Sequence, residues 1–169
     1  GLFAPLRADR GLLPLTATPR DIGNRIEPAL AFLAHDGTRE LVNPTLVAAR
    51  GTQVAINLRN ALAEPTVAHW HGLTMDTRND GNGETLIAAA DRFDYRFTVH
   101  NRAGLYWYHP HPHGATARQA HLGLLGLLAI EDDEELALRR ALELVPGETE
   151  IPLVLHEWRG SAAGRYVPS

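Results

Sequence analysis

The sequence predicts an all-β fold, an antiparallel sandwich or barrel built from short strands. Apolar and polar residues alternate from Phe93 to Val99 and again from Gln53 to Arg59, which is typical of strands with one buried face. Turn-forming residues separate such segments, above all the Asn-Asp-Gly-Asn-Gly run at 79–83. Several short strands with turns between them are the pattern of a sandwich or a barrel.

Three further segments complete the predicted strands. The first, 66–73, follows a break at Glu64-Pro65, and the second, 105–109, follows a turn at 101–104. The third is the apolar stretch 122–130, whose composition favours a buried strand.

One helix is expected, from about 132 to 144. Asp132 can cap its first turn, and Glu135 lies three residues further on, as in a capping box. The arginines at 139–140 follow toward the carboxyl end, where the helix dipole favours positive charge. We therefore interpret the charged run as a solvated helical face that ends at the Val-Pro-Gly segment 145–147.

Composition indicates an ordinary globular domain. Of the 169 residues, 44% are hydrophobic and 21% are charged, and a net charge of −4 without a basic cluster argues against nucleic-acid binding. The longest apolar stretch, His121 to Ile130, is too short to span a membrane. With no cysteine, the chain cannot form a disulfide, a zinc–thiolate site or a blue-copper thiolate site by itself. No signal peptide is visible at Gly1.

Two His-x-His pairs, His69 with His71 and His109 with His111, dominate the chemistry of the chain. Because side chains alternate along a strand, each pair is expected to place both imidazoles on one side. Neutral imidazole is the commonest metal-ligating side chain and suits copper, zinc and iron. Pro110 cannot donate to a sheet, which places it at a strand end, an edge or a bulge. Four such ligands without an obvious second set indicate half of a metal centre.

The segments around these pairs resemble the first cupredoxin domain of the laccase-like multicopper oxidases. The resemblance rests on Arg-Gly-Thr-Gln-Val-Ala-Ile-Asn-Leu-Arg-Asn, His-Trp-His-Gly-Leu, Asn-Asp-Gly, Tyr-Trp-Tyr-His-Pro-His-Pro-His-Gly and Gly-Leu-Leu-Gly-Leu-Leu-Ala-Ile-Glu-Asp. It runs in register from about Asn43 to Asp132. It implies a Greek-key β-sandwich of the cupredoxin type, to which the predicted helix would be added near the carboxyl end.

The resemblance implies a role for each histidine of the two pairs. His69 would bind the type 2 copper, His71 and His109 would share one type 3 copper, and His111 would bind the other type 3 copper. In the family, four more histidines from a C-terminal cupredoxin domain, of the same protein or another subunit, complete this trinuclear cluster. That domain also holds the type 1 copper through two histidines, a cysteine and usually a methionine, whereas this chain has no cysteine and only Met75.

The chain is therefore expected to contain one domain and the beginning of another. Residues 1–145 would form the first cupredoxin domain. Residues 146–169 would form a linker and the first strand of a following domain, starting in the apolar run from Ile151 to Leu155.

Asp80 and His113 lie close in sequence to the predicted ligands. Asp80 can be explained as a turn former. In similar oxidases, however, an acid at this motif helps to supply protons during dioxygen reduction, and a carboxylate there could also orient a metal-bound water. We expect His113 to support the site structurally and not to be a ligand.

Other aromatic and imidazole side chains are assigned no direct chemistry. Trp70, Trp107 and Tyr108 flank the ligands, and we interpret them as packing residues that exclude water and restrict imidazole rotamers. The remaining histidines lack a paired context and are expected at the surface or partly buried: His35, His100, His121 and His156.

The resemblance implies a parent protein that oxidises phenols, aromatic amines or metal ions and reduces dioxygen to water, in the periplasm or outside the cell. This chain alone, with half of the trinuclear ligands and no type 1 site, is expected to be inactive. Two alternatives stay open: a non-redox copper- or zinc-binding β-sandwich module, and a zinc hydrolase or lyase that uses His69 and His71 with a third histidine. The Trp-Tyr-His-Pro-His segment argues against both, because neither needs it.

Overall fold

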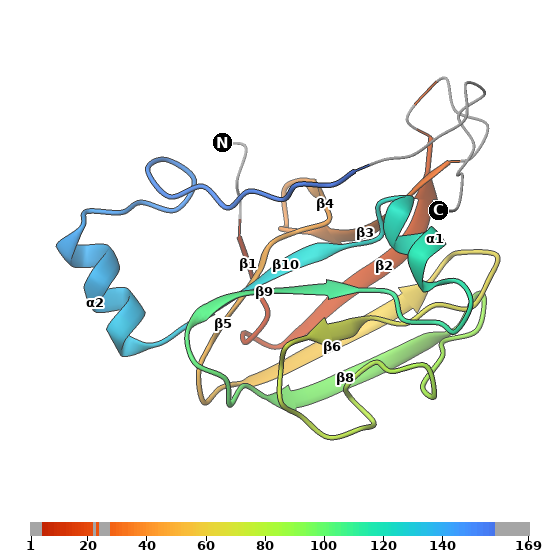
Figure 1. Cartoon of the computed structure of the whole chain (residues 1–169), viewed down its shortest axis with the longest axis horizontal. Helices are drawn as coiled ribbons and strands as arrows, with labels where there is room; N and C mark the ends of the chain where they lie inside the picture. Colours follow the sequence, from red (N-terminus) through yellow and green to blue (C-terminus); the bar gives the residue numbers. More distant parts are fainter. Residues whose placement is uncertain (1–4, 22, 24–27, 158–169) are drawn as a thin grey trace.

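The computed structural model describes residues 5–21, 23 and 28–157, which form two five-stranded sheets packed face to face (Figure 1). The first sheet has the order β1 (Leu6–Arg7), β5 (Leu46–Ala49), β10 (Gly126–Glu131), β9 (Gly104–His109) and β7 (His69–His71). The second has the order β4 (Glu40–Val42), β3 (Ala29–His35), β2 (Leu12–Arg20), β6 (Gln53–Asn60) and β8 (Arg92–Thr98).

The predicted β-sandwich is confirmed, but its sheets are not purely antiparallel. β5 runs parallel to both β1 and β10, and β2 runs parallel to β6. Parallel neighbours need long crossover connections, so they join segments that are far apart in the sequence. The chain thereby brings its first described strand beside β5 and ties the two ends of the domain together.

Aromatic side chains from both sheets meet in the core. Trp70 of β7 and Tyr108 of β9 are fully buried, with ring centres 5.5 Å apart. From the opposite sheet, Tyr95 and Phe97 of β8 approach Trp70 to 5.3 Å and 5.4 Å. Large buried aromatic rings dominate core energetics, so this cluster holds the two sheets together next to β7.

The described residues include two short helices, where we predicted one. The predicted helix is α2 (Asp133–Ala141), which lies beyond one end of the sandwich (Figure 1). Asp132 caps it as expected, because its side chain accepts a hydrogen bond from the Glu135 N–H. No residue of α2 is buried, which agrees with a solvated helical face.

The second helix, α1 (Thr116–His121), was not predicted. Its buried Gln119 fixes it to the segment before β7, accepting from the Thr66 hydroxyl at 2.8 Å and donating to the Pro65 carbonyl at 2.9 Å. The strand predicted over 122–130 consequently begins only at Gly126, after the end of α1.

An ionic network joins α2 to the sheet and to the chain that follows. Glu131 of β10 pairs with Arg7 of β1 and with Arg139 of α2. Arg139 also pairs with Glu150, at 2.9 Å. These contacts hold the segment after α2 against the outer face of the first sheet.

The segment 151–157, where we expected the first strand of a following domain, has no strand partner among the described residues. A strand needs a neighbour for its backbone hydrogen bonds, so the division of the chain into two parts stays a prediction. Within the part of the chain that the structure describes, none of the helices has the length and apolar character needed to cross a membrane.

Candidate metal centre

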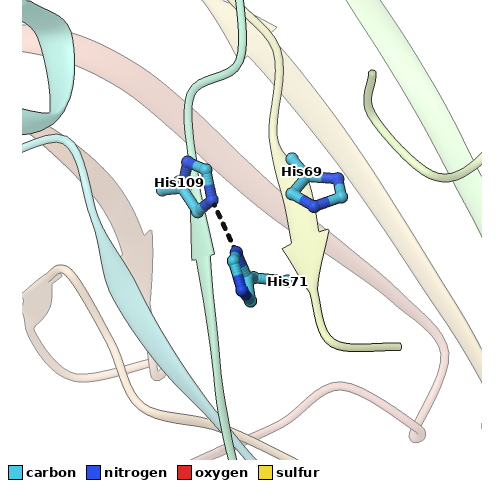
Figure 2. A group of neighbouring side chains, drawn as sticks. All are labelled: His69, His71 and His109. Carbon is cyan, nitrogen blue, oxygen red and sulfur yellow. Dashed lines mark hydrogen bonds between the residues drawn. The ribbon is translucent and has the colours of Figure 1, made fainter. Parts of the chain in front are cut away.

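The two histidine pairs meet where β7 and β9 run side by side at the edge of the first sheet (Figure 2). In this antiparallel pair, His69 lies opposite His109 and His71 lies opposite Trp107. Successive strand residues point to opposite faces, so these four side chains share the outer face of the sheet. The placement of His69 and His71 on one side is thus confirmed.

His111 joins the same group by a different route from the one we predicted. β9 ends at His109, because Pro110 cannot continue the ladder, so the second pair does not owe its arrangement to strand alternation. The chain nevertheless brings the His111 ring to 5.2 Å from the His69 ring and 6.0 Å from the His109 ring. All four predicted imidazoles therefore gather at one place.

Three of these imidazoles form a compact group of possible metal ligands. One nitrogen from each of His69, His71 and His109 lies within 4.8 Å of the others. The ring centres of His69 and His71 are 5.7 Å apart, and both rings lie within 5.4 Å of that of His109. Imidazole nitrogens at this spacing can share one metal ion or bind neighbouring ions.

Backbone carbonyls select which nitrogen two of the histidines present. The Nδ1 atom of His69 lies 2.8 Å from the Asp80 carbonyl oxygen, and Nδ1 of His109 lies 2.8 Å from that of Pro110. A carbonyl oxygen can only accept, so each Nδ1 must carry the proton. In the neutral ring the lone pair is then on Nε2, which is the atom that a metal would bind.

His71 presents the other nitrogen. Its Nδ1 faces Nε2 of His109 at 3.2 Å, along the dashed line in Figure 2. Two nitrogens about 2.0 Å from one ion, at a tetrahedral angle, lie about 3.3 Å apart, so this pair fits a shared ion. The donor set therefore suits an imidazole-bound copper or zinc ion.

Burial favours the neutral, metal-binding form of His109. Its side chain is 6% exposed, and desolvation lowers its pKa from 6.5 to about 4. The hydrogen bond to Pro110 opposes this shift, whereas the neighbouring imidazoles add to it. His71 and His111, by contrast, are exposed and face outward from the sheet.

Asp80 contacts His69 with its backbone and its side chain. In addition to the carbonyl contact, its carboxylate Oδ2 lies 3.5 Å from the same Nδ1 atom. The carboxylate is 29% exposed, so it contacts solvent as well as His69. This position suits both the turn-forming and the proton-supplying interpretation of Asp80.

A glycine lets the Asp80 loop approach β7, and an asparagine ties the same loop to β8. Gly81 has a φ of +72°, and a Cβ there would lie 1.8 Å from the Ala68 carbonyl oxygen, so only glycine fits. Asn79 is buried and accepts a hydrogen bond from the Arg96 N–H at 2.7 Å. The Asn-Asp-Gly sequence predicted a turn here, but not this close approach to the ligand strand.

Tyr95 supports the site from the opposite sheet. Its hydroxyl accepts a hydrogen bond at 3.0 Å from the N–H of Ala68, the residue before His69, and burial raises the pKa of the phenol. The sequence indicates that Tyr95 is a core residue but contains no signal for this contact, which depends on the packing of the two sheets.

The flanking aromatic residues divide into two groups. Trp70 and Tyr108 point inward and pack in the core, as predicted. Trp107 points outward, stacks on His109 with ring centres 4.1 Å apart, and lies 4.9 Å from His71. It covers one side of the imidazole group while remaining 37% exposed itself.

The other histidines lie apart from this group or at its margin. His35 and His100 are exposed, as expected, and His113 is exposed just beyond the second pair. His121 is half-buried and His156 is exposed, as expected, but their ring centres lie only 6.0 Å apart, which the sequence did not indicate. The C-terminal segment folds back over the sheet and brings them together.

Comparison with known protein families agrees with this geometry. A family described as "Multicopper oxidase" matches residues 37–135, which include both histidine pairs and all of β5 to β10. This match covers more than half of the chain.

Individual relatives point the same way. A multicopper oxidase of Staphylococcus aureus is 38% identical over 117 residues, which are 69% of this chain and 25% of that protein. A bilirubin oxidase of Albifimbria verrucaria is 31% identical over 124 residues, covering 73% of this chain and 21% of that protein. The chain thus spans about a quarter of the length of these relatives.

A solved structure extends the likeness to the whole described fold. The McoA multicopper oxidase of Aquifex aeolicus superposes with a TM-score of 0.88 at 27% sequence identity, covering 100% of this chain and 37% of that one. The sandwich, the histidine group at its edge and the family match agree, and we conclude that the chain belongs to the multicopper oxidase family.

Proposed function

We propose that this chain is the N-terminal part of a laccase-like multicopper oxidase and supplies half of the ligands of a trinuclear copper cluster. The observation that carries the proposal is the pair of facing nitrogens, His71 Nδ1 and His109 Nε2, 3.2 Å apart within a group of four imidazoles. His69 would bind the type 2 copper through Nε2. His71 and His109 would share one type 3 copper, and His111 would bind the other.

The protons on these imidazoles must rearrange when a metal binds. Without metal, the His109 Nε2 lone pair faces His71 Nδ1, which then carries the proton between them. Ligation through Nδ1 of His71 requires that proton to leave, and the outward-facing Nε2 of His71 can take it up. His69 and His109 need no such change, because carbonyl groups already hold their Nδ1 protons.

Asp80 would serve as the proton donor of the site. Bound copper supplies one-electron redox chemistry, and the reduction of dioxygen to water consumes protons at the same place. The Asp80 carboxylate is within 3.5 Å of His69 and partly open to solvent, so it can deliver a proton and recover another from water. Its backbone carbonyl meanwhile keeps His69 in the required tautomer.

The rest of the site would come from C-terminal cupredoxin domains, of the same protein or of another subunit. The exposure of His71 and His111 on the outer face of the sheet fits ligands that meet a second set across an interface. Phenols, aromatic amines or metal ions are the proposed electron donors, dioxygen the acceptor, and the periplasm or the cell exterior the location.

The alternative is a non-redox module that stores or delivers copper or zinc. It is favoured by the His71–His109 pair alone, since the spacing of these nitrogens also fits zinc. The two proposals differ in the number of ions that the four histidines bind and in whether catalysis appears once the missing ligands are supplied.

The experiment is a copper titration of the full chain followed by electron paramagnetic resonance. We expect Cu(II) to bind with nitrogen hyperfine coupling, without the intense blue band of a type 1 site and without dye oxidation. Substitution of His69, His71, His109 or His111 by alanine should each weaken binding, whereas His100→Ala, at an exposed histidine elsewhere, should not. Copper binding that is unchanged in all four variants would overturn the assignment.

Catalysis is tested by restoring the missing half. The chain would be joined to the C-terminal domains of the Staphylococcus aureus relative in place of the matching segment. Oxidation of a phenolic dye under air that requires His109 and His111 would support the oxidase. A fusion that binds copper at both type 3 positions yet leaves the dye unoxidised would support the binding module.

A further inference from the structure

Two histidines outside the proposed cluster meet at the end of α1. His121 is the last residue of this helix, and His156 lies in the segment that follows α2. Their ring centres are 6.0 Å apart and their planes are inclined by 64°. His121 is half-buried and His156 is exposed, so the pair lies where the C-terminal segment meets the domain surface.

The spacing of the two rings fits one shared metal ion. An imidazole bound through a nitrogen about 2.0 Å from the metal has its ring centre roughly 3.2 Å from the ion. Two such rings on one ion are therefore about 5.2 Å apart at a tetrahedral angle and at most about 6.4 Å apart when they are opposite each other. The observed 6.0 Å lies inside this range, as does the 5.4 Å between His71 and His109.

The surroundings form a defined pocket. A cavity of about 550 Å³ is lined by His121, His156, Trp107 and apolar side chains that include Leu125 and Leu127. Apolar walls with a few convergent polar groups are the usual setting of a small-ligand site. Trp107 also stacks on His109, so one indole ring lies between this pocket and the proposed cluster.

The segment that carries His156 is anchored at its start. Glu150 pairs with Arg139 of α2 at 2.9 Å, and its carbonyl accepts a hydrogen bond from the Gly147 N–H at 2.8 Å. These contacts fix the start of the segment six residues before His156. This anchor limits how far the segment can move from the domain, which reduces the entropy lost when an ion binds His156.

We propose that His121 and His156 bind a first-row transition-metal ion, copper(II) or zinc(II), and thereby clamp the segment 151–157 to the end of α1. Two imidazoles with water in the remaining positions suit either ion. The proposal does not depend on the assignment of the trinuclear ligands, because the two sites share no ligand.

The test uses the full chain with the proposed cluster removed by alanine at His69, His71, His109 and His111. This variant should still bind one Cu(II) or Zn(II) ion per chain in calorimetry. Adding His121→Ala or His156→Ala should weaken binding at least about tenfold. Loss of a group that only hydrogen-bonds to a metal ligand already weakens binding by about this much. Adding His35→Ala or His100→Ala, at exposed histidines elsewhere, should leave it unchanged.

Two further readouts separate ligation from a structural effect. Cu(II), but not Zn(II), should quench the fluorescence of Trp107, and Trp107→Phe should remove that part of the quenching. Either ion should slow amide hydrogen exchange in residues 151–157. His156 is exposed, so its substitution should not unfold the sandwich.

The outcomes decide the proposal. A single ion whose binding requires both His121 and His156 supports it, whichever of the two metals binds more tightly. No binding to the cluster-free variant overturns it. Binding that is the same with and without the two histidines also overturns it, because the ion would then sit elsewhere.

Discussion

The two faces of β7 and β9 carry opposite kinds of side chain within a few ångströms of each other. On the inner face, Trp70 and Tyr108 are fully buried and bound into an aromatic cluster. On the outer face, His71 and Trp107 are exposed, with ring centres 4.9 Å apart. The same short strands therefore supply both part of the core and a set of candidate metal ligands.

This contrast shows how an exposed site can still be rigid. The Tyr108 hydroxyl donates to the Pro44 carbonyl at 2.8 Å, and its ring leaves so little room that a Cβ at Gly126 would lie 2.2 Å from it. Packing on the inner face fixes the backbone, and the backbone fixes the Cα positions of the ligands. A preorganised metal site needs such packing on the opposite face of the strands that carry its ligands.

The largest effect is expected on the inner face, from Trp70→Ala. Removal of a fully buried tryptophan should lower the free energy of unfolding by about 3–5 kcal/mol. The matched outer-face change, Trp107→Ala, should cost much less, because that ring is 37% exposed. Urea unfolding of both variants measures the difference, and equal losses would contradict the contrast between the faces.

The next largest effect should come from Gly81→Ala, which would push the Asp80 loop away from Ala68 and His69. The new methyl group would collide with the Ala68 carbonyl at a positive φ, so we expect a loss of about 2–3 kcal/mol and weaker copper binding. Gly83→Ala is the control, because its nearest neighbour is 3.4 Å away, an ordinary contact. Urea denaturation and copper titration of both variants test this prediction. If Gly81→Ala changed neither stability nor copper affinity, the loop would not be what holds His69.

A smaller effect is expected when the link between the sheets is cut by Tyr95→Phe. This change leaves the buried Ala68 N–H without an acceptor, which should cost about 1–2 kcal/mol. Because Ala68 precedes His69, copper affinity should fall as well. Tyr108→Phe, which removes a hydroxyl on the other side of the cluster, should cost about 1 kcal/mol. If Tyr108→Phe reduced copper affinity as much as Tyr95→Phe, the Ala68 contact would have no special role.

The smallest effect is expected from a change of one pH unit, from pH 7 to pH 6. The pKa of His109 is lowered from 6.5 to about 4, so the unfolded chain takes up a proton before the folded one as the pH falls. Stability of the metal-free protein should therefore decrease on acidification between these two values, by about 0.7 kcal/mol from pH 7 to pH 6. Urea unfolding at a series of pH values measures this dependence, and His109→Gln should remove the contribution of His109. If stability fell equally steeply with pH in both proteins, His109 would not be desolvated.

Sequence patterns predicted the site better than they predicted the sheets. The alternation around Tyr95 and the placement of His69 and His71 on one side depend on local spacing, and both predictions are confirmed. His111 lies beyond the end of β9, so the same argument does not explain its position. β2 and β3 were not predicted, since β2 contains Pro14 and Pro19 and β3 is rich in alanine, residues that strands usually avoid. α1 was missed because six residues are too few to show a helical period.

Residue patterns alone did not predict which atoms of distant segments meet. The choice of Nδ1 or Nε2 depends on where the Asp80 and Pro110 carbonyls lie, which only the folded backbone determines. The approach of His156 to His121 likewise depends on the path of the chain after α2, which returns to the surface formed by Trp107 and Leu127. Residue types indicate which chemistry is available, whereas tertiary packing decides which atoms take part.

The position of β7 at the edge of its sheet has one more consequence, which concerns what can dock there. An exposed sheet edge normally invites a strand from another chain, and long flat edges lead to aggregation. β7 has only three residues and is followed directly by Gly72 at a φ of +85°, so it offers too short a row of backbone groups for such pairing. The edge that carries His69 and His71 thus admits a metal ion and opposing side chains while it excludes an added strand.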